Sequence, residues 1–100
     1  MYNFGDVVLA QIHFVDTSDI KIRPAFVLFQ EEGNIVVAGI TSNLKMKGIP
    51  FTKKEGAIKE SIIKINYIFT ISEMMIKKYL LSLNQNKKER VKNKLIKRLN

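Results

Sequence analysis

Two polar segments in the otherwise apolar first half of the chain hold side chains that could carry out chemistry. One is the loop of residues 16–23, which ends in Arg23 immediately before Pro24, and the other is Thr41-Ser42-Asn43. A guanidinium binds phosphate oxygens in a bidentate geometry and stays charged at physiological pH, whereas a threonine hydroxyl donates one hydrogen bond. Arg23 and Thr41 are therefore candidates for binding an anion and stabilising negative charge.

RNA is a substrate that needs little more than this pair, because its own 2′-hydroxyl is the nucleophile. A site that cleaves RNA must position that hydroxyl, move a proton and stabilise the charge on the phosphorane. Arg23 suits the charge but is a poor proton acceptor. His13 and Asp16 can accept a proton, although a lone His on a strand is more often structural and an Asp in such a loop more often forms a turn.

The same residues also have ordinary structural interpretations. Arg23 stands at the start of an expected strand, where it could form a surface ion pair with Asp16 or Asp19. Thr41 is of a type common in strands, and Ser42-Asn43 resembles a turn. The residues by themselves indicate an anion site without deciding between these interpretations.

Other kinds of site are excluded by the composition. The 100 residues include no Cys and one His, which leaves no disulfide, no thiolate catalysis and no Cys/His zinc site. The sequence also lacks a Gly-rich phosphate loop, a nucleophile elbow and a cluster of metal ligands. We therefore expect neither a metal nor another cofactor.

The formal charge of +8 favours an anionic partner, but it is unevenly distributed. From Gln85 to the end, seven basic residues stand against one acidic residue, so only +2 remains for the first 84 residues. A basic terminal helix is more often a solvated face than a surface that recognises bases. The total charge is thus a weak argument for nucleic acid.

The length and hydropathy of the chain predict one soluble domain over residues 1–100. With 46% hydrophobic residues, the chain has enough apolar material for a single core. Residues 1–6 lack the basic and apolar regions of a signal peptide, and no apolar run approaches the roughly 18 residues of a membrane span. We expect a cytoplasmic protein that does not associate with a membrane.

The first half of the chain predicts three strands, at residues 7–14, 24–29 and 35–41. They are rich in β-branched and aromatic residues and are separated by turn formers. In the first strand Val8, Ala10, Ile12 and Phe14 share one face, which predicts a strand packed mainly on one side. Because Gly33 and Asn34 suit a tight turn, the second and third strands form a hairpin, which places Arg23 and Thr41 near the same end.

The second half predicts a polar loop, further strands and two helices. Residues 45–60 form the loop with a short strand at 49–52, residues 61–67 are extended, and residues 68–71 add a last short strand, for a total of about five. Ser72 is expected to cap a short helix through residue 81, with Met75 and Tyr79 on one face.

A second helix follows, capped by Asn84 or by Asn86 in a capping box with Glu89. Its apolar stripe docks on the barrel and is formed by Val91, Leu95, Ile96 and Leu99. Strands followed by a terminal helix indicate a mainly β fold, a small barrel with a C-terminal α-helix.

Several short segments together carry a resemblance to a known family. In chain order they are Gly5-Asp6-Val7-Val8-Leu9, Phe14-Val15-Asp16-Thr17-Ser18, Lys21-Ile22-Arg23-Pro24-Ala25-Phe26-Val27-Leu28 and Val37-Ala38-Gly39-Ile40-Thr41-Ser42. In order and spacing they resemble the PemK/MazF-like toxins of type II toxin-antitoxin systems, over most of the chain. Glu60-Ser61 and Leu83-Asn84 also fit the positions where that family has a later strand and its last helix.

The resemblance implies an SH3-like barrel and a homodimer that binds single-stranded RNA along its interface. It implies sequence-specific, metal-independent cleavage that leaves a 2′,3′-cyclic phosphate, with Arg23 and Thr41 as the catalytic residues. Bases could stack on Phe14 or Phe51. By position, the substrate-binding residues would be Asp16, Ser18, Lys21, Ser42, Lys45, Lys47, Phe51 and Lys53.

The resemblance further implies a cognate antitoxin whose disordered acidic segment folds as it blocks the RNA groove. The chain departs from the family at Gly39, where a bulkier residue or proline is usual, and in its basic terminal helix, which would suit either the antitoxin or RNA. Two alternatives remain open. One is a non-catalytic SH3-like toxin or binding module acting on a protein such as a topoisomerase, and the other is an inactive relative that binds RNA or the antitoxin.

Overall fold

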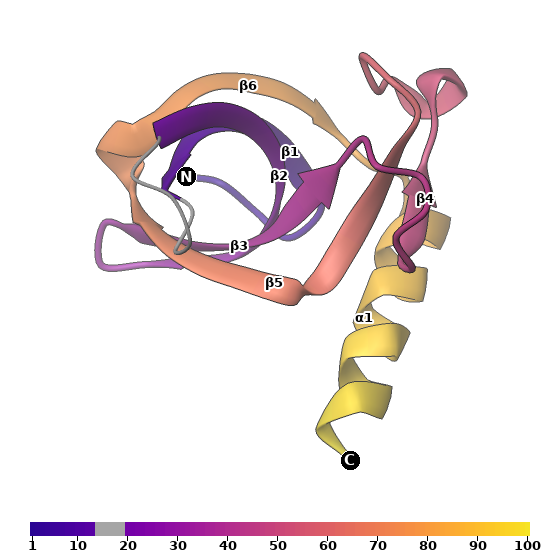
Figure 1. Ribbon diagram of the computed structural model, residues 1–100. Coiled ribbons are helices and arrows are strands. Elements are labelled where there is room, and N and C mark those ends of the chain that lie inside the picture. The colour runs from indigo at the N-terminus through magenta and orange to yellow at the C-terminus, as the bar shows by residue number, and fades with distance from the viewer. Residues whose placement is uncertain (14–19) are drawn as a thin grey trace.

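Six antiparallel strands curl into a half-barrel that is followed by a C-terminal helix (Figure 1). The computed structural model describes residues 1–13 and 20–100. The strand order across the sheet is β4-β5-β3-β2-β1-β6. The elements are β1 (Asp6–His13), β2 (Ile20–Glu31), β3 (Asn34–Thr41), β4 (Ile49–Phe51), β5 (Ser61–Ser72), β6 (Ile76–Ser82) and α1 (Gln85–Leu99).

β2 and β3 form the predicted hairpin. Their tight turn places Glu32 at φ 51° and Gly33 at φ 79°, the positive values that two-residue hairpin turns require. The register runs from Glu31 opposite Asn34 to Ala25 opposite Gly39, with a one-residue shift between Val27 and Phe29. The hairpin is therefore confirmed, although its turn residues are Glu32 and Gly33 and not the predicted Gly33 and Asn34. Beyond the Ala25–Gly39 pair, the two strands extend to Arg23 and Thr41.

The sheet separates two apolar clusters, so that consecutive residues of β1 belong to different ones. Val7 packs with Phe26, β4, β5 and α1, whereas Val8, Ala10 and Ile12 pack with the other face of β2 and β3. The face that the sequence predicts for these three residues of β1 is thus confirmed. Val7 and Val8 are both 0% exposed, so β1 is buried on two sides, and the expectation that it packs mainly on one side is wrong.

β5 is one continuous strand where the sequence predicts two, and the sheet has six strands against the expected five or so. Its ladder with β3 has a bulge, because Lys64 pairs with Gly39 while Ile68 pairs with Ala38. Figure 1 shows β5 turning sharply along its length. The bend lets one strand pair with β3 on both sides of the bulge and with β4 at its start.

The predicted helix over residues 72–81 is wrong. Ser72 does act as an N-cap, with its Oγ accepting from the Met74 N–H at 3.2 Å, but only for the single 3₁₀ turn η2 (Glu73–Met75). The chain then continues as β6, which pairs with β1 from Asp6 opposite Ser82 onward. The backbone N–H and C=O groups on the open side of β1 require hydrogen-bond partners. Pairing with β1 therefore outweighs the four-residue spacing of Met75 and Tyr79, which is typical of a helix.

α1 is capped by Asn84, whose Oδ1 accepts from the Lys87 N–H at 2.9 Å. The alternative box between Asn86 and Glu89 does not form, since Glu89 accepts from the Gln85 side chain instead. Only the first half of the predicted stripe docks: Val91 is 0% exposed, but Leu99 is 84% exposed. In Figure 1 the C-terminal end of α1 extends away from the strands.

Among the residues that the structure describes, no helix is long and apolar enough to cross a membrane.

Candidate active site

A pocket of about 490 Å³ opens where β2 begins and β3 ends, and both predicted catalytic residues line it. Continuing the hairpin register two residues past the Ala25–Gly39 pair sets Arg23 across from Thr41, on one face of the sheet. The described lining residues are Ile12, Ile22, Arg23, Pro24, Gly39, Ile40, Thr41, Ser42, Asn43, Phe51, Gly56, Ala57, Ile58, Lys59, Ser61, Tyr67, Phe69 and Leu80. The hairpin thus brings a guanidinium and a hydroxyl to one pocket, as its geometry predicts.

Arg23 is exposed at this end of β2. Its Nη1 donates one long hydrogen bond, 3.4 Å, to the carbonyl oxygen of Ile22. Within residues 1–13 and 20–100 no carboxylate lies at ion-pair distance from it, and Asp16 and Asp19, the partners of the structural interpretation, lie outside the described residues. The guanidinium therefore has donors available for an anion in the pocket.

Thr41 is half-buried, and its hydroxyl is oriented by the turn that follows β3. Thr41 Oγ1 accepts from the Asn43 N–H at 3.1 Å, and Asn43 Oδ1 in turn accepts from the Lys45 N–H at 3.1 Å. Since the hydroxyl oxygen accepts in this turn, its hydrogen is the part left to donate. Ser42-Asn43 is a turn, as the structural interpretation holds, and this turn positions the Thr41 hydroxyl.

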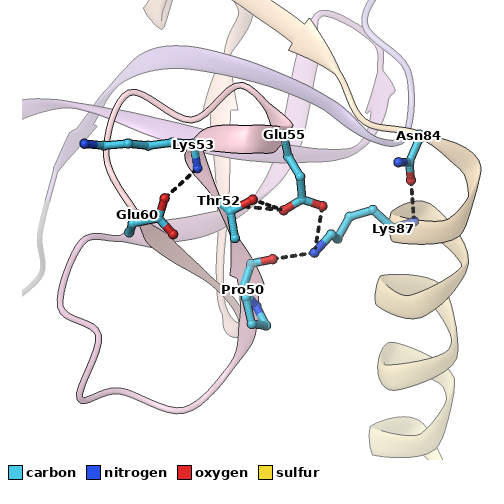
Figure 2. A network of polar contacts seen from close by, with 7 residues as sticks. All are labelled: Pro50, Thr52, Lys53, Glu55, Glu60, Asn84 and Lys87. Carbon is cyan, nitrogen blue, oxygen red and sulfur yellow. Dashed lines mark hydrogen bonds and ion pairs between the residues drawn. The ribbon is translucent and has the colours of Figure 1, made fainter.

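We call residues 22–24 and 40–43 the reactive wall of the pocket and residues 51 and 56–61 the anchored wall. The anchored wall is held to α1 by Lys87, which is 9% exposed (Figure 2). Lys87 Nζ donates to the Pro50 carbonyl oxygen at 2.6 Å and forms an ion pair with Glu55 at 3.0 Å. Lys87 therefore attaches the anchored wall to the first turn of α1.

Glu55 ends the 3₁₀ turn η1 (Lys53–Glu55) and binds both Lys87 of α1 and Thr52, the N-cap of η1. Its Oε1 accepts from the Thr52 N–H at 2.9 Å and from the Thr52 hydroxyl at 3.1 Å. Burial raises the pKa of this carboxyl, but the Thr52 backbone hydrogen bond and Lys87 outweigh it and hold the pKa below the ordinary value of 4.5. Glu55 is therefore ionised at neutral pH and serves as an anchor.

A second buried lysine holds the segment before β4. Lys64 is 9% exposed, and its Nζ donates to the Lys47 carbonyl oxygen at 2.6 Å. Glu60 accepts from the Lys53 N–H at 2.8 Å, which closes the loop between them. The loop of residues 45–60 is therefore tied at several points by charged side chains.

The predicted substrate-binding residues divide into three groups. Ser42 and Phe51 line the pocket, although Phe51 is 2% exposed and packs in the core, so its ring offers almost no free face to a base. Lys21, Lys45, Lys47 and Lys53 are exposed but are not among the lining residues. Asp16, Ser18 and Phe14 lie outside the described residues, as does the side chain of His13.

Three lining residues were not singled out by the sequence: Lys59, Ser61 and Tyr67. Lys59 follows Ile58 in the polar loop, where nothing in its spacing distinguishes it from the neighbouring lysines. In the sequence Tyr67 continues the alternation of Ile63 and Ile65, which predicts a core position, yet it is 40% exposed. The bulge in β5 explains this difference.

The arrangement can bind a phosphate and stabilise charge that develops on it. Within the described parts of the chain, no group of three or more His, Asp or Glu side chains could hold a metal ion. The lining residues with polar side chains are Arg23, Thr41, Ser42, Asn43, Lys59, Ser61 and Tyr67.

The comparisons with known proteins agree with this architecture. Solved structures of similar fold include the Mycobacterium tuberculosis toxin MazF-mt6, with 20% identity, 88% of this chain and 89% of that chain covered, and a TM-score of 0.73. MazF from Deinococcus radiodurans has 16% identity, covers 98% and 96%, and has a TM-score of 0.71.

A mycobacterial endoribonuclease, solved in complex with its cognate antitoxin, has 11% identity, covers 99% and 95%, and has a TM-score of 0.75. A search of curated protein sequences finds no match. The family model for PemK-like, MazF-like toxins matches residues 3–99, nearly the whole chain. The chain therefore belongs to the PemK-like, MazF-like toxins of type II toxin-antitoxin systems.

Proposed function

We propose that this protein is a toxin that cleaves single-stranded RNA at specific sequences without a metal ion. The observation that carries the proposal is the presence of Arg23 and Thr41 on the same wall of one pocket. A guanidinium and a hydroxyl are the groups that a cleavage driven by the RNA's own 2′-hydroxyl requires. Membership of the toxin family supports the same conclusion.

In this reaction the 2′-hydroxyl loses its proton and its oxygen attacks the adjacent phosphorus. The bond from phosphorus to the 5′-oxygen breaks, and that oxygen takes up a proton, so the products are a 2′,3′-cyclic phosphate and a 5′-hydroxyl. Arg23 stabilises the negative charge on the phosphorane through bidentate hydrogen bonds. Thr41 donates its hydroxyl hydrogen to a phosphate oxygen and keeps the phosphorus in place.

The proton acceptor is a separate role, which Arg23 cannot fill because its guanidinium stays protonated. Glu55 is committed to Lys87 and Thr52 and does not line the pocket. His13 and Asp16 are candidates of suitable chemistry, because His13 ends the strand that pairs with β2 and Asp16 stands seven residues before Arg23 in the chain. Separate substitutions of His13 and Asp16 test which of the two accepts the proton.

The remainder of the RNA would be held by charge and by turn residues around the pocket. Lys59 lines it, while Lys21, Lys45, Lys47 and Lys53 are exposed nearby in the chain and would contact flanking phosphates. Ser42 adds a hydrogen-bonding group beside Thr41. The sequence preference would come from groups that contact base edges of the unpaired strand.

The proposal includes a cognate antitoxin and a homodimer in the cytoplasm. The antitoxin is supported by the fold likeness to an endoribonuclease that was solved with its own antitoxin. An acidic, disordered antitoxin segment would complement a chain of charge +8. Sedimentation of the purified chain over a range of concentrations tests the homodimer directly.

The test of the catalytic proposal is incubation of the purified protein with a long single-stranded RNA in excess EDTA. Fragment ends are mapped for the wild type, for Arg23→Ala and for the matched control Arg98→Ala, an exposed arginine at the end of α1. We expect wild type and Arg98→Ala to leave cyclic-phosphate and 5′-hydroxyl ends, and Arg23→Ala to leave the RNA intact.

Cleavage that disappears in EDTA and returns with a divalent ion would contradict metal independence. The absence of cleavage by the wild type on several varied RNAs would instead favour a non-catalytic binding module. Equal cleavage by wild type and a folded Arg23→Ala variant would remove Arg23 from the mechanism.

A further inference from the structure

Three aromatic residues of the described part of the chain line the pocket: Phe51, Tyr67 and Phe69. Phe51 is 2% exposed, and Phe69 packs half-buried against the second core cluster. Tyr67 differs from both because it is 40% exposed. Of the three side chains, Tyr67 therefore has the largest surface available to a ligand.

The bulge in β5 is what takes Tyr67 out of the core. Lys64 pairs with Gly39 and Ile68 pairs with Ala38, so residues 65–67 have no counterpart on β3. Ile63 and Ile65 remain buried, but the alternation ends there and Tyr67 reaches the pocket. Bulges commonly re-aim a side chain next to a functional site.

Gly39 gives the two aromatic residues of β5 the room to lie against β3. A Cβ at position 39 would be 3.3 Å from the Cβ of Tyr67 and 3.3 Å from Cε2 of Phe69, closer than ordinary van der Waals contact. Tyr67 and Phe69 of β5 therefore occupy space that a side chain at position 39 of β3 would need.

Lys64 holds the Tyr67 ring. Its Nζ lies 5.3 Å from the ring centroid, and the same Nζ donates to the Lys47 carbonyl oxygen at 2.6 Å. A cation over an aromatic ring is attracted by the negative face of the π system. Because Lys64 is itself anchored, it restricts the ring before a ligand arrives, and a restricted ring loses less entropy on binding.

We propose that Tyr67 is the base-stacking platform of this pocket. Its exposed surface takes one nucleobase of single-stranded RNA while Arg23 and Thr41 hold the adjacent phosphate. The inference rests on the proposed function, since it takes the pocket to be the RNA site. Every nucleobase has a π face, so stacking supplies affinity and position without selecting one base.

The test measures binding apart from cleavage, with a mixed-sequence single-stranded oligonucleotide of 2′-deoxy sugars that lacks the attacking hydroxyl. Fluorescence anisotropy gives its Kd for the wild type, for Tyr67→Leu, which keeps apolar volume without a π face, and for Tyr67→Phe, which keeps the ring. We expect about a tenfold weaker Kd for Tyr67→Leu and a change within about twofold for Tyr67→Phe.

Tyr79→Leu is the matched control, because Tyr79 is 46% exposed on β6 and is not among the residues that line the pocket. Its Kd should equal that of the wild type. The chain has no Trp and three Tyr, so tyrosine emission gives a second readout. We expect the oligonucleotide to quench it in the wild type and much less in Tyr67→Phe.

Cleavage separates this inference from the proposed function. With RNA as substrate, Tyr67→Leu should raise KM about tenfold and leave kcat nearly unchanged, whereas loss of Arg23 acts on kcat. Equal Kd for wild type and a folded Tyr67→Leu variant, or no binding by the wild type, would overturn the stacking role. Weaker binding by Tyr67→Leu in a protein that cleaves no RNA would support stacking and overturn the catalytic proposal.

Discussion

The two walls of the pocket hold their cations in opposite ways. On the reactive wall, Arg23 is exposed, and among the described residues its side chain makes one hydrogen bond, of 3.4 Å, to the neighbouring Ile22 carbonyl. Behind the anchored wall, Lys87 is 9% exposed and bonds both to Pro50 at 2.6 Å and to Glu55 at 3.0 Å. A buried cation with satisfied donors maintains structure, whereas an exposed cation with free donors can bind substrate.

This difference predicts that the walls respond differently to mutation. Substitutions on the reactive wall should change activity and leave stability nearly unchanged, because few native interactions are lost there. Substitutions in the anchoring network should lower stability first, and activity only through the shape of the wall. The predictions below test this contrast.

The largest expected effect is that of Arg23→Ala on catalysis. Loss of the guanidinium should lower kcat by about 10³-fold, or about 4 kcal/mol of transition-state stabilisation, with the free energy of unfolding unchanged within about 0.5 kcal/mol. Single-turnover cleavage and urea unfolding measure the two quantities. Arg23→Lys should remain strongly impaired because an ammonium lacks the planar fork. A destabilised Arg23→Ala protein would break the contrast between the walls.

Lys87→Ala should have the opposite signature. It leaves the Glu55 carboxylate and the Pro50 carbonyl without their donor, and should lower the free energy of unfolding by about 2–3 kcal/mol. The control is Lys94→Ala, on the exposed part of α1, with a change within about 0.5 kcal/mol. Unchanged stability of Lys87→Ala in urea unfolding would show that the helix does not support the pocket.

Thr41→Ala should reduce kcat by about 10–100-fold, less than the loss of Arg23, because one neutral hydrogen-bond donor disappears. Thr41→Ser keeps the hydroxyl that accepts from the Asn43 N–H and should retain activity within about threefold. The ratio of the two rates is the measurement. Equal activity of the Ala and Ser variants would place Thr41 in the turn alone.

Stability at acid pH should depend on Glu55. The folded pKa of its carboxyl lies below the ordinary 4.5, so its contribution is fully present above that value and is lost as the pH falls through the folded pKa. Urea unfolding between pH 6 and pH 3 should therefore show a smaller pH dependence for Glu55→Gln than for wild type. Glu31→Gln, at the exposed end of β2, is the control. Identical slopes for Glu55→Gln and wild type would contradict the network.

The smallest effect is expected at His13, where we predict that His13→Ala changes kcat by less than about twofold. A lone histidine on a strand is more often structural than catalytic. The rate should be measured across pH 5–8, with Asp16→Asn measured in parallel. A large loss for His13→Ala, with a flattened pH profile, would assign it as the proton acceptor.

The parts of the fold that were predicted correctly rest on local information. The hairpin of β2 and β3 follows from two apolar runs around Gly33, but the alignment of Arg23 with Thr41 also depends on the one-residue register shift between Val27 and Phe29, which the sequence does not indicate. The Asn84 cap and the short strand at residues 49–51 are likewise local signals. The residue types of the reactive wall can therefore be read from the sequence.

The parts that failed depend on partners far away in the chain. β6 forms because β1 needs a neighbour on its open side, a demand that no pattern within residues 76–82 expresses. Ile96 and Leu99 match an apolar stripe yet stay exposed, because α1 leaves the barrel before reaching them. The spacing of apolar residues shows which side of a helix can be buried. How many of those residues are buried depends on the length of the surface against which the helix packs.

The sequence by itself identified Arg23 and Thr41 as candidate residues and predicted the hairpin between them, because residue types and local turn signals can be read directly from the chain. Only the tertiary structure decided which lysines are structural and which aromatic ring is available. Lys64, Lys87 and Tyr67 resemble ordinary surface or core residues until the bulge of β5 and the docking of α1 place them. Burial and long-range pairing set those roles, and both are properties of the folded chain.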